Sequence, residues 1–135
     1  MERRALQIAV ALAGLVPLTA GALGILQPAM LGLYGDRSAT AHFAYLSGLL
    51  LGIGMAYWWV LPDIEKRSYA FTLLTVIVFI GGVARLSMAF RIGSLQPAIT
   101  LPLLMELTIT PLLWAWQQRV ARVCHARDRV PTPGN

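Results

Sequence analysis

Apolar residues gather in four long runs along this chain, separated by short polar stretches. The runs cover about residues 5–26, 42–61, 69–90 and 98–118, and each is close to the ~20 residues that a helix needs to cross ~30 Å of hydrocarbon. Helix is the expected state because lipid offers no hydrogen-bond partner to open backbone groups. The pattern therefore predicts an all-α fold, an integral membrane bundle of four helices.

The polar stretches between the second, third and fourth runs are short. Short connections place consecutive helices side by side and antiparallel, so we expect an up-down-up-down topology. The fourth helix is expected to continue as a basic cytoplasmic helix to about residue 129, which gives a single domain over residues 1–129. Residues 130–135 include two prolines and a glycine and are expected to form a disordered tail.

The composition agrees with burial in lipid. The chain is 57% hydrophobic and 13% charged, whereas a typical soluble domain is about 45–50% apolar and about 25% charged. A chain of 135 residues has too much surface per volume to hide this excess in a globular core. A net charge of +5 would suggest nucleic acid as the partner of a soluble protein, but four spans and a short tail argue against it here.

The distribution of basic residues predicts the orientation in the membrane. Four crossings put both termini and the middle loop on one side, and that side carries eight Lys or Arg residues against two on the other. By the positive-inside rule, the N- and C-termini are cytoplasmic, and Trp114 and Trp116 fall at the cytoplasmic interface. The eight are Arg3, Arg4, Lys66, Arg67, Arg119, Arg122, Arg127 and Arg129, and the two are Arg37 and Arg91.

The first run has a second interpretation. Met1 to Arg4, an apolar run and the small residues from Thr19 to Ala22 resemble a signal peptide with its cleavage site. The apolar run is long for a signal peptide, so we favour a membrane span.

Two charged residues fall inside the predicted spans, Arg85 in the third and Glu106 in the fourth. A charge at the centre of a span costs at least ~2.5–3.5 kcal/mol, so such residues usually face the bundle interior and pair. Arg85 lies about five residues, roughly 7 Å, from the outer end of its helix, and Glu106 about nine residues, roughly 13 Å, from the outer end of its own. Because helical side chains lean toward the N-terminus of their helix, the two charges approach the same depth.

This pair admits two interpretations. One is a polar ligand-binding site in the outer half of the bundle, completed by His42 and Tyr45. Such a site would bind a lipid headgroup, a quinone or another amphiphile, or would relay protons. The other is a buried ion pair that fixes the register of the helices and contributes little net stability.

Gly48 and Gly52 form a GxxxG motif in the second run. Small residues four apart let membrane helices approach closely. The motif is a candidate interface for oligomerisation or for a larger partner, although packing inside the bundle is the simpler explanation.

Signals for metal or cofactor chemistry are absent from the sequence. Cys124 and His125 are adjacent, but zinc needs about four ligands and the only other histidine, His42, lies far along the chain. We therefore expect no metal, no cofactor and no catalytic residues.

Cys124 is a candidate for palmitoylation if the source is eukaryotic. The basic residues beyond Trp116 either meet anionic headgroups or serve only to set the topology.

Several stretches resemble a known bacterial family. They are Leu33-Tyr34-Gly35, the runs 45–54 and 81–86, and Glu106 with Pro111-Leu112-Leu113. Over roughly residues 5–118 they resemble domain-of-unknown-function family 4345, a group of small four-helix membrane proteins. The resemblance implies a bacterial inner membrane and an Arg85–Glu106 pair as a family feature. A basic residue often precedes the position of Tyr45 in the family, whereas this chain has Ala44, so a family site that includes that residue is altered here.

The resemblance implies no activity, because none is assigned to the family. We expect a non-enzymatic accessory or structural subunit that packs against a larger membrane complex, respiratory or photosynthetic, or against itself. The alternative is a small amphiphile- or lipid-binding or transport bundle centred on Arg85 and Glu106, with a lipid or quinone as the ligand. A membrane enzyme ranks third, because one arginine and one carboxylate are too few for a reaction.

Overall fold

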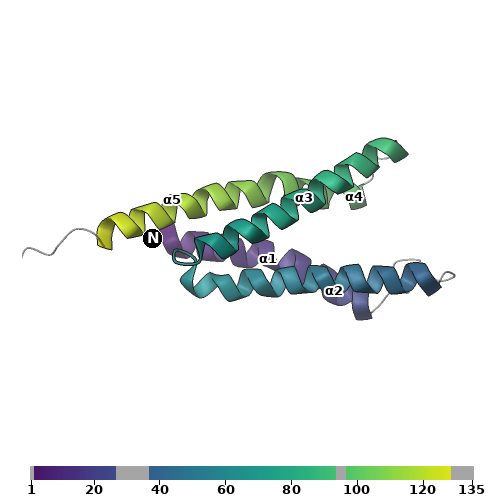
Figure 1. Cartoon of the computed structure of the whole chain (residues 1–135), viewed down its shortest axis with the longest axis horizontal. Helices are drawn as coiled ribbons and strands as arrows, with labels where there is room; N and C mark the ends of the chain where they lie inside the picture. The colour runs from purple at the N-terminus through teal and green to yellow at the C-terminus, as the bar shows by residue number, and fades with distance from the viewer. Residues whose placement is uncertain (1, 27–36, 94–96, 129–135) are drawn as a thin grey trace, which may run out of the picture. The chain divides into compact units, whose positions relative to one another are not determined.

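The computed structural model describes residues 2–26, 37–93 and 97–128, and its regular elements there are all helical (Figure 1). In chain order they are α1 (Glu2–Leu26), α2 (Arg37–Val60), a 3-10 turn η2 (Leu61–Asp63), α3 (Ser68–Ile92), α4 (Pro97–Leu104), a π-helical turn η3 (Met105–Ile109) and α5 (Thr110–Asp128).

Four stretches are long and apolar enough to cross a membrane: Glu2–Leu26, Arg37–Asp63, Ser68–Ile92 and Ile99–Cys124. The prediction of an all-α fold with four helices of membrane-spanning length and composition is confirmed. These helices indicate a multi-pass membrane protein.

The helices are longer than the apolar runs that predicted them. α1 begins at Glu2 rather than near residue 5, and α2 begins at Arg37 rather than near residue 42. A hydropathy pattern detects only the apolar part of a helix, whereas backbone hydrogen bonding continues into polar flanks. α3 ends at Ile92 and is capped by Gly93, which has a left-handed φ of 66° and donates its N–H to the carbonyl of Ala89. The predicted tail, residues 130–135, lies outside the described residues.

The chain divides into two compact units. One is Val10–Pro62, which holds most of α1 together with α2. The other combines Met1–Ala9 with Asp63–Asn135 and so holds the start of α1 with α3, α4, η3 and α5.

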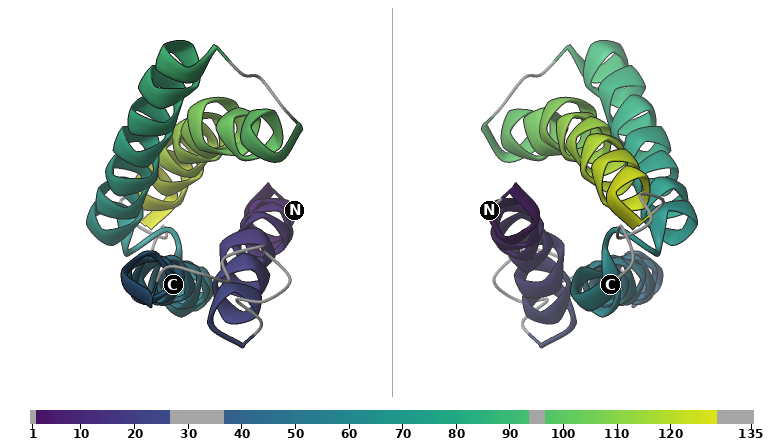
Figure 2. Two further views of the ribbon diagram at one scale, coloured as in Figure 1. Left: turned by 90° about the vertical axis from the view of Figure 1, so that its right-hand side faces the viewer. Right: turned by 90° about the vertical axis from the view of Figure 1, so that its left-hand side faces the viewer.

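Within the unit Val10–Pro62, glycines bring α1 and α2 side by side (Figures 1 and 2). A Cβ on Gly21 would stand 2.5 Å from the backbone nitrogen of Leu51 and 2.7 Å from the carbonyl oxygen of Ser47. A Cβ on Gly54 would stand 2.8 Å from the backbone nitrogen of Leu18. Only residues without a side chain permit so close an approach.

Within the other unit, α3 lies against the helical path from α4 to α5 (Figure 2). Trp114 Nε1 and Gln118 Nε2 both donate to Thr72 Oγ1, over 2.9 Å and 3.2 Å. Further along, a Cβ on Gly82 would stand 2.8 Å from a methyl group of Leu107.

Most of the apolar surface of the four spans is exposed. In the apolar 18-residue core of each span, only 22% of the residues are buried within the protein in the first three spans and 6% in the fourth. Large side chains such as Leu26 and Phe90 are each 76% exposed. Soluble proteins rarely leave so much contiguous apolar surface in water, which agrees with helices that lie in a membrane.

Candidate functional site

Arg85 of α3 and Glu106 of η3 form an ion pair, as the sequence predicts. Arg85 donates from Nε to Glu106 Oε2 over 3.2 Å and from Nη2 to Glu106 Oε1 over 3.1 Å. Both carboxylate oxygens therefore accept a bond. Two parallel charge-assisted bonds fix the relative orientation of the groups as well as joining them.

The backbone of α3 brings Glu106 within reach of Arg85. Gly82 lies one turn before Arg85, and a Cβ there would stand 2.9 Å from the Cβ of Glu106. A larger residue at this position would push η3 away from α3. Gly81 differs, because nothing lies within 4 Å of its Cβ position, so the surface beside it is open.

Glu106 lies in the π-helical turn η3. The N–H of Thr110 donates to the carbonyl of Met105, five residues back, and the hydroxyl of Thr110 donates to the same carbonyl over 2.9 Å. Pro111 follows this turn, and in a regular α-helix its ring would clash with the carbonyl of Leu107. The wider turn accommodates the proline, and single π-turns occur frequently at functional sites.

The guanidinium of Arg85 keeps unused hydrogen-bonding capacity. Of its five N–H donors, two bond to Glu106 and the other three have no partner among the described residues. The Arg85 side chain is 42% exposed, whereas that of Glu106 is 16% exposed. The pair therefore presents Arg85 donors, rather than carboxylate oxygens, to its surroundings.

His42 and Tyr45 lie on α2, in the other compact unit. Both are exposed, and their ring centroids are 6.5 Å apart with planes tilted by 33°. Their place in a site with Arg85 and Glu106 stays a prediction.

Gly48 and Gly52 have open space beside them on α2, although their neighbours Ser47 and Leu51 meet Gly21 of α1. Nothing stands within 4 Å of a Cβ at either position in the described part of the chain. The role of this motif as an interface stays a prediction. The glycines that do meet the neighbouring helix in this unit are Gly14, Gly21, Gly24 and Gly54.

Sequence reasoning missed a polar anchor near the start of α3. Gln117 of α5 is fully buried and donates from Nε2 to the carbonyl of Ile64 over 2.7 Å and to Ser68 Oγ over 2.8 Å. The signal was an amide next to the tryptophans that end the fourth apolar run, which by itself indicates only the end of a span.

Ion pairs gather at the same end of this unit. Arg3 Nε lies 3.0 Å from Glu65 Oε2, close enough for an ion pair although the geometry is not that of a hydrogen bond. Arg119 Nη2 lies 3.8 Å from Glu2 Oε1. The start of α1, the turn that precedes α3 and the middle of α5 thus lie close together.

No group of three His, Cys, Asp or Glu side chains suited to a metal ion occurs within residues 2–26, 37–93 and 97–128. Cys124 is a free, half-buried thiol.

No curated protein and no solved structure significantly matches the chain. The sequence model of one family, described as a domain of unknown function (DUF4345), matches residues 5–117. The match runs from α1 into α5 and includes both Arg85 and Glu106. Because it covers most of the sequence, this chain belongs to the DUF4345 family.

Proposed function

We propose that this protein is a non-enzymatic, multi-pass protein of the bacterial inner membrane that binds a small amphiphile at Arg85 and Glu106. The observation that carries the proposal is the guanidinium of Arg85, which is held by two bonds to Glu106 and keeps three donors without a partner in the described residues. Donors at this depth need an acceptor, because hydrocarbon offers none. Oxygen atoms of a lipid headgroup or a quinone carbonyl meet that need.

Glu106 gives the site its electrostatic balance. The carboxylate cancels the charge of Arg85 and fixes the plane of the guanidinium, so a ligand binds without leaving an isolated charge in hydrocarbon. Gly81, which borders open space, and the exposed Met88 lie one turn before and one turn after Arg85 on the same face of α3. This face offers room for a headgroup and apolar contact for a tail.

The orientation follows from the basic residues. The contacts from Arg3 to Glu65 and from Glu2 to Arg119 support placing the start of α1, the turn before α3 and the basic part of α5 at one membrane face. The excess of Lys and Arg makes that face cytoplasmic. With the helices in up-down-up-down order, both termini are cytoplasmic and the Arg85–Glu106 pair lies in the outer half of the membrane.

The test is the amount of ligand that remains with the purified protein. Wild type and Arg85→Leu are isolated in mild detergent, and their bound lipids and quinones are extracted and quantified by mass spectrometry per mole of protein. We expect one amphiphile class to fall at least about tenfold in Arg85→Leu, since charge-assisted hydrogen bonds are lost. Arg91→Leu is the matched control, because Arg91 is also exposed on α3 but lies outside the pair. Equal amphiphile content in wild type and Arg85→Leu would overturn the proposal.

A second candidate function is that of an accessory subunit in a larger respiratory or photosynthetic membrane complex. It is favoured by the open surface at Gly48 and Gly52, where nothing in the described residues stands within 4 Å of an added Cβ. Such a surface admits a helix of another chain or of a second copy. Mild-detergent extraction from the native membrane tests it: a wild-type complex of constant composition should dissociate in Gly48→Leu/Gly52→Leu and persist in Gly81→Leu. A lone monomer in the wild type would rule it out.

A further inference from the structure

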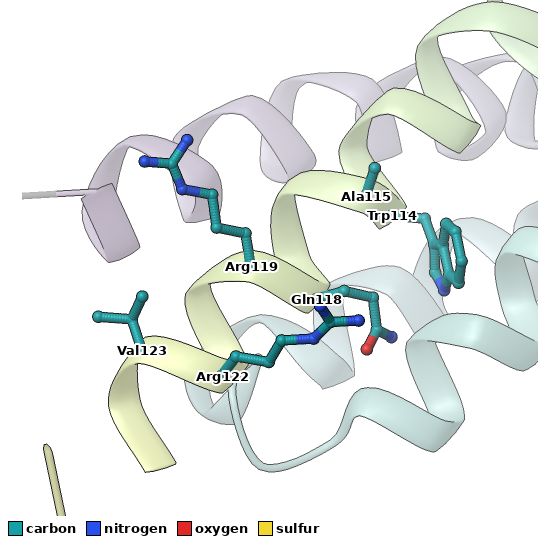
Figure 3. Close-up of a pocket in the computed structure, with 6 residues that line it drawn as sticks. All are labelled: Trp114, Ala115, Gln118, Arg119, Arg122 and Val123. Carbon is teal, nitrogen blue, oxygen red and sulfur yellow. The ribbon is translucent and has the colours of Figure 1, made fainter. Parts of the chain in front are cut away.

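One face of α5 carries a second surface with charged side chains on a largely apolar lining, distinct from the Arg85–Glu106 pair. An open hollow of about 460 Å³ lies over this face (Figure 3). Its centre is about 13 residues beyond Glu106, roughly 20 Å along the helical path. The residues that line it are Trp114, Ala115, Gln118, Arg119, Arg122 and Val123.

Two guanidinium groups border the hollow with most of their donors unused. Arg122 is exposed and has no partner among the described residues. Arg119 makes one distant ion pair, 3.8 Å from Glu2, in which the two side chains are 74% and 58% exposed. An exposed pair of this kind contributes little and yields readily to a competing anion. Figure 3 shows Arg122 lying back along α5 toward Gln118, while Arg119 extends toward the start of α1, where its ion-pair partner Glu2 lies.

The wall of the hollow is held in place from α3. Thr72 Oγ1 accepts bonds from Trp114 Nε1 over 2.9 Å and from Gln118 Nε2 over 3.2 Å. The indole and the amide are therefore positioned before any ligand arrives. Tryptophan with an apolar body and a polar N–H is typical of the headgroup level of a bilayer.

We infer that this hollow binds the phosphate of an anionic phospholipid. Arginine is suited to phosphate because its planar donors engage two oxygens at once, and Arg119 and Arg122 are one turn apart on the same helix face. Val123 and Ala115 add apolar contact for the glycerol and the upper acyl chain. A zwitterionic lipid fits less well, because its cationic group meets the same two arginines. The inference does not depend on the function proposed for Arg85.

The test titrates the detergent-solubilised full chain with phosphatidylglycerol and with phosphatidylcholine, and counts bound lipids by native mass spectrometry. Wild type should prefer phosphatidylglycerol. The free energy that one basic residue contributes near an anionic surface corresponds to about a fivefold change in binding. The preference for phosphatidylglycerol should therefore fall about fivefold in Arg122→Gln and about thirtyfold in Arg119→Gln/Arg122→Gln. Arg91→Gln removes the same charge elsewhere on the protein and should keep the preference.

A second substitution leaves both arginines in place. Ala115→Glu puts a carboxylate into the hollow and should abolish the preference, whereas Ala115→Gln, of the same size, should retain it. The inference is overturned if Arg119→Gln/Arg122→Gln still prefers phosphatidylglycerol as wild type does. It is also overturned if Arg91→Gln lowers the preference for phosphatidylglycerol as much as the double variant does. Arg85→Leu should leave this preference intact, so failure here and failure of the function proposed for Arg85 are told apart.

Discussion

Arg85 and Glu106 form an ion pair between two helices that are long and apolar enough to cross a membrane, where either charge alone would be costly in lipid. Each carboxylate oxygen of Glu106 accepts one N–H bond from Arg85, and the carboxylate is the less exposed partner. Breaking such a pair on one side leaves an uncompensated charge, whereas replacing both residues by apolar ones removes the desolvation cost together with the attraction. The stability of the protein should therefore depend on the match between the two residues more than on the presence of either.

A double-mutant cycle measures this dependence. Arg85→Leu and Glu106→Leu should each lower the free energy of unfolding in detergent by about 2–3 kcal/mol, while the double variant should lie within about 1 kcal/mol of wild type. Unfolding is followed by circular dichroism as a denaturing detergent is added. Additive effects of the two single variants would show that the ion pair contributes no coupling. Stability and ligand binding can be told apart, because Arg85→Leu/Glu106→Leu should be about as stable as wild type and yet retain no amphiphile.

At the residue scale, the sequence predicted the ion pair but not the backbone around it. The energetic cost of charge in hydrocarbon points to Arg85 and Glu106 from hydropathy alone, and helix direction brings them to a similar depth. The π-turn that carries Glu106 shifts a single hydrogen bond, from Thr110 to Met105, and such a shift leaves no mark on the hydropathy pattern. Gln117 was missed for a related reason, because burial of one amide depends on how the turn before α3 folds back.

At the element scale, the spacing of glycines did not reveal which helix face is packed. Gly48 and Gly52 have the familiar four-residue spacing, yet it is Gly54, with Gly21 opposite Leu51, that allows α2 to approach α1. The GxxxG motif is defined by the spacing of glycines along one helix, whereas packing depends on which face of that helix meets its neighbour. The four spans were predicted well because hydropathy and length depend on the bilayer, but their register depends on side-chain fit.

Two alanine substitutions separate the packed glycines from the open ones. In Gly21→Ala the new methyl group would stand 2.5 Å from the backbone nitrogen of Leu51, which cannot move without shifting α2, so we expect a loss of about 1–3 kcal/mol. In Gly48→Ala the methyl group meets nothing within 4 Å, and the better helix propensity of alanine should add up to about 1 kcal/mol. Thermal unfolding of the purified, partner-free protein compares them. Equal destabilisation by both would contradict the observed contact between α1 and α2.

At the scale of the whole molecule, orientation links the two proposed binding sites to the two leaflets. In the proposed orientation, which puts both termini in the cytoplasm, the arginines that border the hollow on α5 would face the inner leaflet, and the Arg85–Glu106 pair would lie in the outer half. An inverted protein would exchange these leaflets, so the proposed ligands would have to come from the opposite lipid pools. The balance of eight basic residues against two makes the uninverted arrangement the expected one.

The single native cysteine provides a direct probe of this orientation. Cys124 lies near the end of α5, is half-buried, and is the only thiol in the chain. In intact bacteria a membrane-impermeant maleimide should leave Cys124 unlabelled, and labelling should appear once the membrane is permeabilised. Cys124→Ser/Ser38→Cys moves the thiol to the start of α2, among exposed residues at the opposite end of that helix from the turn before α3. This variant should be labelled without permeabilisation. If Cys124 is labelled in intact cells and Ser38→Cys is not, the arginines of α5 face the outer leaflet. The orientation predicted by the positive-inside rule would then be wrong, and other features of the chain would control its insertion.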